Sequence, residues 1–351
     1  MNYNKKIHIH PHILTPAYFE YLDKYEGPTP DNFATPKWSE KAHLKLMDDL
    51  GVAFSLMSVS SPHIIKAQGA ERIDFCRRMN EEGLVVVSHH PDRLGLFAIL
   101  PLPDVDAACK MAEEYLKKDG IYGIGVMTNY DGMYLGSDKM DPLLKVLNKK
   151  KAVVCVHPAM PAAIPGDALP NFPIPTMDFL MDTTRAFTNM VWYDKFIKYP
   201  DIKWIWPHGA SFMTIESDRF ANFSVLAKKN GNKNKLDYYG AMKHCWFDTA
   251  GFSVPKQLDA MRLDIPMDHF LYGSDCPYTP NIVCKALAGQ LESTNKLSKK
   301  EKKMMFTTNG QELIPGLDDI MKGVKGGSRK DSHMRKVFGK VIDVVDARLK
   351  K

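Results

Sequence analysis

The sequence lacks four features that would each place it in another class of protein. None of its apolar runs reaches about 18 residues, the length at which a helix spans a membrane. Its six cysteines include no CxxC pair, which argues against a zinc ribbon or a disulfide scaffold. It carries no glycine-rich dinucleotide fingerprint and no internal repeat. With 44% apolar residues among 351, the chain instead predicts a globular fold with a large core.

Positive charge is concentrated at one end of the chain. The formal net charge is +6, and residues 318–351 contribute +5, because they hold ten Lys and Arg against five Asp and Glu. We interpret this tail as a solvated or subunit-contacting helix rather than as a nucleic-acid site. The N-terminal residues contain no apolar stretch of signal-peptide length. We therefore expect a cytoplasmic protein that binds neither membrane nor nucleic acid.

Short apolar runs alternate with longer amphipathic stretches along the chain, a pattern typical of βα units and a parallel sheet. Stretches such as 39–50, 70–89, 104–117 and 141–148 repeat apolar residues at helical spacing. Eight strands favour a distorted TIM (β/α)8 barrel, and a doubly wound sheet is the alternative. We expect the barrel over residues 1–317 and a helical extension over residues 318–351. The expected strands are 6–12, 53–59, 95–100, 123–128, 152–157, 203–207, 245–248 and 270–272.

Three histidines occupy alternate positions in the first expected strand. Because side chains of a strand alternate between its faces, His8, His10 and His12 are expected to share one surface. Imidazole nitrogens at this spacing are suited to chelating a divalent ion. A chance cluster is the alternative interpretation.

Further polar residues stand at the carboxyl ends of other expected strands. His157 ends the fifth, His208 follows the sixth, and Asp275 follows the eighth. Each signal alone is weak, but a closed parallel barrel brings all its strand ends to one mouth. The proline-rich stretches 15–37 and 158–175 also follow strands, so we expect them to form walls of the same site.

The chain resembles the amidohydrolase superfamily, and in particular its branch of metal-dependent, non-oxidative decarboxylases typified by aminocarboxymuconate-semialdehyde decarboxylase. The resemblance covers roughly residues 7–315. The family's opening I-D-x-H-x-H is matched with His8 in place of the aspartate. The other matching motifs are H-P at 157–158, H-G at 208–209, G-S-D at 273–275 and N-x-x-x-L-x-P at 309–315.

This resemblance implies a site built around one divalent ion. It assigns His10, His12, His157 and Asp275 as ligands, while His208 acts unligated on the substrate. A shifted register, with His8 and His10 as ligands, is the alternative. Zinc is the first expectation for the ion and manganese the second, with no organic cofactor. We expect a near-neutral pKa for His208, so that it moves a proton at working pH.

The activity implied is non-oxidative decarboxylation of a small aromatic or unsaturated carboxylic acid of the hydroxybenzoate type. Asp275 or His208 would supply the proton that replaces the carboxylate. The same residues would also serve a metal-dependent hydrolase, in which an activated water attacks an ester, lactone or amide. We therefore hold hydrolysis as the second hypothesis.

Four further residues are candidates for contact with the substrate. Relatives that act on a muconate place an arginine where this chain has His43, so a differently substituted acid is expected here. Asn129, Met160 and Trp192 lie near the ends of the fourth and fifth expected strands. Since relatives are commonly dimers, we also expect a homodimer or higher homo-oligomer.

Overall fold

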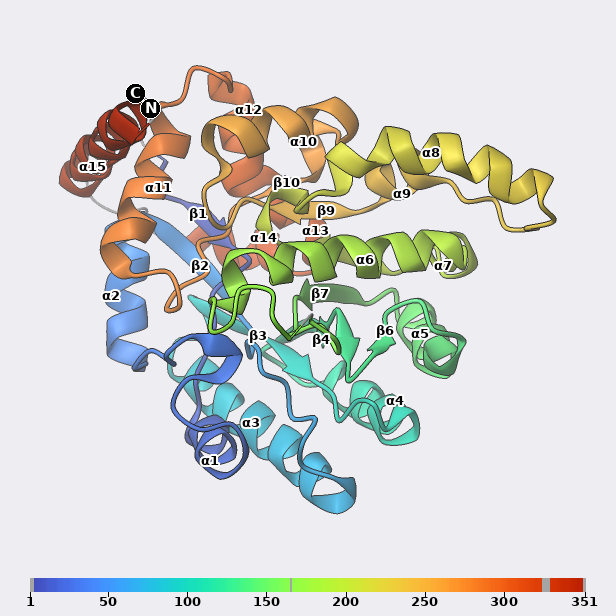
Figure 1. Ribbon diagram of the computed structural model, residues 1–351. Coiled ribbons are helices and arrows are strands. Elements are labelled where there is room, and N and C mark those ends of the chain that lie inside the picture. Colours follow the sequence, from blue (N-terminus) through green and yellow to red (C-terminus); the bar gives the residue numbers. More distant parts are fainter. Residues whose placement is uncertain (1–2, 165, 324–328, 350–351) are drawn as a thin grey trace.

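The structure is a computed structural model that describes residues 3–164, 166–323 and 329–349. Eight parallel strands form one sheet in the order β1-β2-β3-β4-β7-β8-β9-β10. A bridge between His8 and Tyr272 joins the first strand to the end of the last, so the sheet closes into the expected TIM barrel (Figure 1). Its strands are β1 (Lys6–His8), β2 (Val52–Met57), β3 (Leu94–Ile99), β4 (Ile121–Met127), β7 (Val153–His157), β8 (Lys203–Trp206), β9 (Trp246–Asp248) and β10 (Phe270–Leu271), and β5 (Asn129–Tyr130) pairs with β6 (Met133–Tyr134) outside the barrel.

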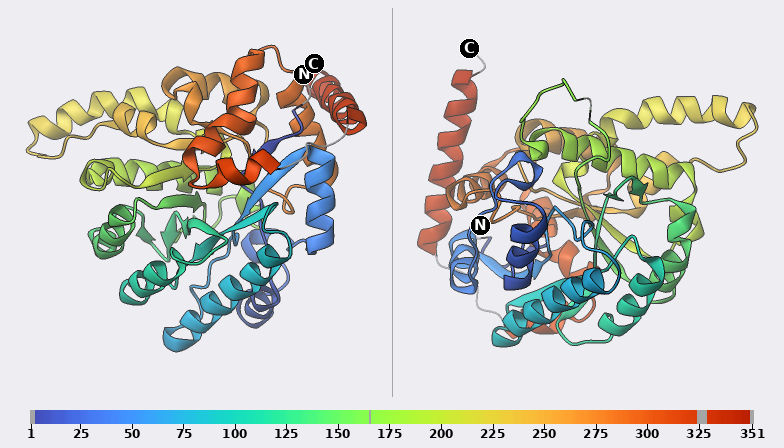
Figure 2. Two further views of the ribbon diagram at one scale, coloured as in Figure 1. Left: turned by 180° about the vertical axis from the view of Figure 1, so that it is seen from behind. Right: turned by 60° about the horizontal axis from the view of Figure 1, so that its bottom comes forward.

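Helices follow the strands and surround the barrel (Figures 1 and 2). The four helices expected from amphipathic spacing are present as α2 to α5. No described helix is both long and apolar enough to cross a membrane. The helices are α1 (Pro16–Tyr25), α2 (Glu40–Leu50), α3 (Gly69–His89), α4 (Val105–Tyr115), α5 (Asp141–Lys149), α6 (Asp178–Trp192), α7 (Lys195–Lys198), α8 (Met213–Lys229), α9 (Tyr238–His244), α10 (Leu258–Asp264), α11 (Asn281–Ser293), α12 (Lys299–Lys303), α13 (Asn309–Leu313), α14 (Leu317–Gly323) and α15 (Arg329–Leu349).

Two apolar clusters make up the core. The larger one lies between the strands and the surrounding helices. The second combines side chains from six strands, such as Phe54 and Ile205, with Leu313 and Leu317 from α13 and α14. Lys203, the first residue of β8, donates to the carbonyl oxygen of Leu313 at 3.2 Å. The amino-terminal end of the barrel is therefore closed by apolar packing, and the carboxyl ends of the strands are left for chemistry.

The first strand is shorter than expected. β1 ends at His8, and the chain resumes pairing only through isolated bridges of Pro11 and His12. Pro11 has no N–H with which to continue the ladder. The His8 ring packs 5.5 Å from the ring of Tyr272. The expectation of one uninterrupted strand over residues 6–12 is therefore wrong, and of its three histidines only His10 and His12 belong to the group of possible metal ligands.

The C-terminal helix α15 lies against α11 (Figure 1). The two backbones approach so closely that a Cβ on Gly289 would stand 1.8 Å from the carbonyl oxygen of Arg335. The predicted boundary between residues 317 and 318 falls at the start of α14. The division into a barrel and an extension stays a prediction, and residues 324–328 and 350–351 of that extension lie outside the described part.

A buried ionic cluster joins this helix to the first strand. Glu292 on α11 accepts from Arg335 Nε at 2.8 Å and from Lys6 Nζ at 2.7 Å. All three side chains are fully or almost fully buried. Since two buried cations share one carboxylate, its removal would leave both charges unpaired.

We predict that Glu292→Ala lowers the free energy of unfolding by about 3–5 kcal/mol, because it uncovers two buried cations. Urea denaturation followed by circular dichroism measures this change. The exposed Glu312→Ala on α13 is the matched control and should change the free energy by less than about 0.5 kcal/mol. Equal midpoint urea concentrations for the unfolding of the two variants would contradict the prediction.

Candidate active site

Four side chains from distant parts of the chain meet at the carboxyl end of the barrel. His10 and His12 follow β1, His157 ends β7, and Asp275 follows β10. One potential ligand atom from each residue lies within 4.8 Å of those of the others. These are the four residues predicted to hold a metal ion, and His8 is not among them.

Hydrogen bonds orient the three imidazoles in the same way. Each Nδ1 has an oxygen partner: Asp248 Oδ2 at 2.7 Å from His10, the Ser58 carbonyl at 3.3 Å from His12, and the Pro158 carbonyl at 2.8 Å from His157. An Nδ1 that donates to oxygen leaves Nε2 as the unprotonated nitrogen. Within the described residues, His10 Nε2 is buried without a hydrogen-bond partner. Such an orphaned nitrogen fits a position that a metal ion would occupy.

The charges of this cluster also suit a divalent ion. Burial lowers the pKa of His12 and of His157, so both imidazoles are neutral near pH 7. Burial alone would raise the pKa of Asp275, but the His12 ring, whose Nε2 lies 3.1 Å from Oδ1, and the charge of His10 hold it below its usual range. Neutral imidazoles and an ionised carboxylate are the forms that bind metals. At His10, the carboxylates of Asp248 and Asp275 outweigh burial and raise the pKa, so a bound ion would displace a proton there. The ligand types and the forms of the other three residues fit the expected ion.

His208 lies beside the four clustered residues. It begins a short turn after β8, and its ring centroid is 5.0 Å from that of His10. Burial lowers the pKa of His208 to about 4, and the charge of His10 adds to this effect. The expected near-neutral pKa is therefore wrong for the free protein, because the expectation took no account of burial.

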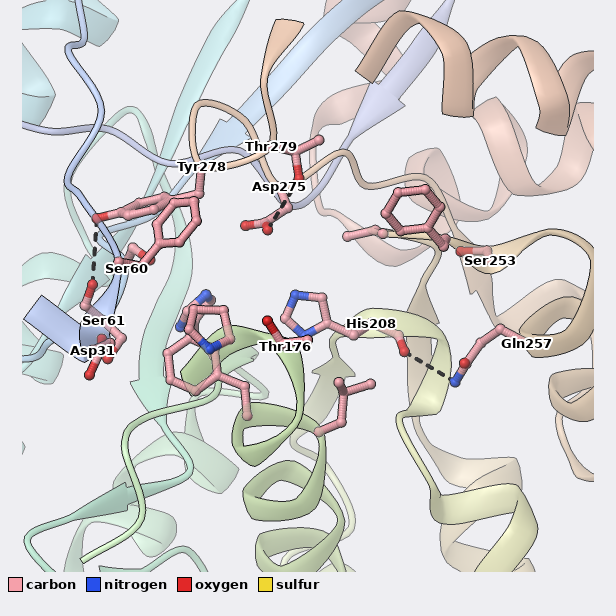
Figure 3. Close-up of a pocket in the computed structure, with 18 of the residues that line it drawn as sticks. Asp31, Ser60, Ser61, Thr176, His208, Ser253, Gln257, Asp275, Tyr278 and Thr279 are labelled. Atoms are coloured by element: carbon pink, nitrogen blue, oxygen red, sulfur yellow. Dashed lines mark hydrogen bonds between the residues drawn. The ribbon is translucent and has the colours of Figure 1, made fainter. Parts of the chain in front are cut away.

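The turn that carries His208 depends on a glycine. Gly209 has a φ of +60°, and a Cβ on it would stand 2.4 Å from Cγ of Gln257. The Gln257 amide donates to the carbonyl oxygens of Gly209 and Ser211, each at 2.7 Å. A longer contact of 3.3 Å joins it to the His208 carbonyl (Figure 3). Gly209, the glycine of the H-G motif, thus leaves space for the Gln257 side chain, whose hydrogen bonds hold the turn in place.

Asp248 contacts the candidate site, and the sequence analysis did not assign it a role. Its Oδ2 contacts His10, and its Oδ1 accepts from the backbone N–H of His208 at 3.2 Å and of Ala250 at 2.9 Å. One carboxylate thereby positions both a predicted ligand and the predicted unligated histidine. Asp248 ends an expected strand, so its placement was available as a signal.

A pocket of about 410 Å³ opens in front of the cluster, with His157, His208 and Asp275 in its lining (Figure 3). The proline-rich stretches 15–37 and 158–175 both contribute, the first with Asp31 and Phe33 and the second with Pro175. The volume lies in the range of small-molecule sites. The expected walls are therefore present.

The four predicted substrate contacts lie elsewhere. His43 is buried on α2 with its Nε2 3.0 Å from Oγ of Ser55. Asn129 donates to the carbonyl oxygen of Met160 at 3.2 Å. Trp192 lines a separate, shallow hollow between α6 and α8. None of the four is among the residues lining the pocket in front of the cluster.

Comparison with known proteins places this chain in a family. The family model described as Amidohydrolase matches residues 7–315. The chain belongs to this family. This amidohydrolase is 28% identical to the decarboxylase yanB of Aspergillus niger over 88% of the chain and 87% of that protein. It is 26% identical to the 6-methylsalicylic acid decarboxylase of Penicillium expansum over 91% and 99% of the two.

Solved structures agree with the fold of this amidohydrolase. A crystal structure of an amidohydrolase II superposes with a TM-score of 0.84 at 36% identity, covering 88% of this chain and 99% of the other. A dihydroxybenzoic acid decarboxylase from a Polaromonas species, solved with manganese and 2-nitroresorcinol, superposes with a TM-score of 0.74 at 20% identity, covering 89% and 97%. At that identity, the second match supports the fold alone.

We predict that Asp248→Ala weakens metal affinity about 10- to 100-fold, because the His10 ring loses the partner that orients it. Metal retained after dialysis against a graded series of chelator concentrations measures this change. Asp259→Asn, at an exposed acid on α10 that pairs with Lys296, is the control and should retain metal like the unaltered protein. Equal retention by the Asp248→Ala variant would remove Asp248 from its orienting role.

Proposed function

We propose that this amidohydrolase catalyses the metal-dependent, non-oxidative decarboxylation of a hydroxybenzoate-type acid. The observation that carries the proposal is the convergence of three imidazoles and one carboxylate, beside His208, in one pocket. The relatives named as decarboxylases, which align over most of their length, support this reaction over hydrolysis.

His10, His12, His157 and Asp275 would hold the ion. The chemistry that a bound divalent ion supplies here is polarisation of the substrate carboxylate and of a neighbouring oxygen. Zinc was the first expectation from the ligand types, but a structural neighbour carries manganese. We therefore propose manganese as the working ion and zinc as the alternative, with no organic cofactor.

The reaction needs one proton delivered to the ring carbon that bears the carboxylate. As the C–C bond breaks, its electron pair returns to the ring and carbon dioxide leaves. Asp275 and His208 influence each other's ionisation and both line the pocket, so we assign this proton to the pair. An anionic substrate beside His208 favours the imidazolium and thus opposes the effect of burial on its pKa.

The apolar side of the pocket holds the ring of the substrate. Phe179 and Leu180 of α6 line the cavity, and the Phe179 ring lies 5.9 Å from the ring of His157. An aromatic acid would bury its ring against these side chains while its carboxylate faces the clustered ligands. This packing excludes water from the carbon that must be protonated.

We predict that the manganese-loaded protein releases carbon dioxide from members of a hydroxybenzoic acid panel, and that chelation abolishes this release. His208→Ala should retain the metal but lower kcat by about 10²- to 10⁴-fold, because it removes an acid–base group. Asp275→Asn should lose both metal content and rate. Carbon dioxide release and bound metal are measured on the same samples.

If the protein instead hydrolysed members of an ester, lactone or amide panel and released no carbon dioxide, the result would support the hydrolase alternative. His244→Ala is the control, since this histidine lies on α9 outside the pocket lining. Full decarboxylase activity in His208→Ala would remove that residue from the reaction.

We also propose a homo-oligomer that works in the cytoplasm without nucleic-acid or membrane partners. Helix α8 extends away from the barrel (Figures 1 and 2) and leaves Ile215, Phe223 and Leu226 exposed. Exposed apolar side chains grouped on one element are typical of interfaces.

We predict that sedimentation equilibrium shows a dimer or larger assembly, and that Phe223→Glu weakens it at least tenfold by placing a charge in the apolar contact. The exposed Lys229→Glu at the end of α8 is the control for the added negative charge. A monomeric unaltered protein would contradict this proposal.

A further inference from the structure

One wall of the pocket carries an acidic side chain with no assigned role. Asp31 lies in the short turn Pro30–Asn32, which belongs to the stretch between β1 and α2. Figure 3 shows Asp31, Ser60 and Ser61 on one side of the cavity, with Gln257 and Ser253 on the other side. His208 and Asp275 lie between these two sides.

The charges that face the cavity are unequally distributed. Among the described residues that line it, none is a lysine or arginine, and the two carboxylates are Asp275 and Asp31. Asp275 belongs to the predicted ligand set, which leaves Asp31 as a second negative group on a separate wall. Lys66, which influences Asp31 from a distance, pairs with Glu26 at 2.6 Å instead. No ion pair within the described residues neutralises Asp31.

The surroundings of Asp31 make it a hydrogen-bond acceptor. Burial raises the pKa of Asp31 to about 6, while the Ser61 hydroxyl opposes this rise. The carboxyl group is therefore mostly ionised at pH 7.5. Its backbone has a φ of +55°, a conformation that Asp and Asn tolerate better than most residues.

We propose that Asp31 is a specificity-determining residue that accepts a hydrogen bond from a hydroxyl or amino group on the substrate ring and excludes a ring with a second carboxylate. This inference rests on the proposed function, because it takes the first carboxylate of the substrate to lie at the clustered ligands. It narrows the substrate class to monocarboxylic acids with a hydrogen-bond donor on the side of the ring that faces the Pro30–Asn32 turn.

The physical basis is the charge of Asp31, which is partly buried in the wall of the cavity. A donor group on the ring gives Asp31 a charge-assisted hydrogen bond, which is worth roughly tenfold or more in affinity. A second carboxylate at the same place would meet a like charge in a cavity whose described lining offers no basic side chain. The same wall therefore favours one substituent and rejects the other.

Calorimetric titration of the manganese-loaded protein tests this inference without requiring turnover. The ligands are benzoate, 3- and 4-hydroxybenzoate, and the matched dicarboxylates isophthalate and terephthalate. In the unaltered protein, we expect one hydroxybenzoate to bind at least tenfold more tightly than benzoate, and its matched dicarboxylate at least tenfold more weakly. In Asp31→Asn, the penalty on the dicarboxylate should shrink at least tenfold while benzoate affinity stays within twofold.

Asn is chosen because it has nearly the same shape and tolerates the positive φ. Asp31→Gly also tolerates that φ and should lose the same discrimination, so a folding defect in one variant does not decide the outcome. Asp23→Asn is the matched control, since it makes the same change at an exposed position of α1.

If Asp31→Asn changed the affinity for all ligands equally, or changed the affinity for none of them, the assignment of Asp31 would be overturned. The expected binding pattern without carbon dioxide release from any acid would contradict only the decarboxylase proposal. Failure of every aromatic acid to bind the metal-loaded protein would contradict both.

Discussion

The candidate site depends on the contact between Asp248 and its two neighbours, His10 and the backbone of His208. In a barrel, strand ends meet at one mouth, but this alone does not decide which way each side chain points. The Asp248 carboxylate determines two of these orientations. One of its oxygens contacts the His10 ring, and the other accepts a hydrogen bond from the His208 N–H. Asp248 is itself buried and is the last residue of β9, so the barrel fixes its position.

The sequence was most informative where regular structure dictates position. All eight strands were predicted, and the residues at their ends converge as a closed parallel barrel requires. His43 and Trp192 did not reach the pocket, because a helical position in the sequence does not reveal which face packs against the sheet. The pKa of His208 depends on burial by neighbours that are distant in sequence. The specificity role proposed for Asp31 depends on the conformation of a loop. The spacing of residues in the sequence predicts neither property.

Strand ends and loops supply different parts of the pocket. The strand ends supply the clustered imidazoles and carboxylate, which many members of a fold can share. The turn at Pro30–Asn32 and the loop with Ser60 and Ser61 supply one wall of the pocket. Because loops change without disturbing the barrel, this arrangement lets one reaction be directed to differently substituted rings.

The ionic cluster around Glu292 links the two ends of the polypeptide. Lys6 stands in the strand that precedes His10 and His12, and Arg335 stands in helix α15. Through Glu292, helix α15 is therefore connected to the strand that leads to His10 and His12. Removing the final helix would remove a cation paired with Glu292 and uncover the face of α11 on which that helix packs.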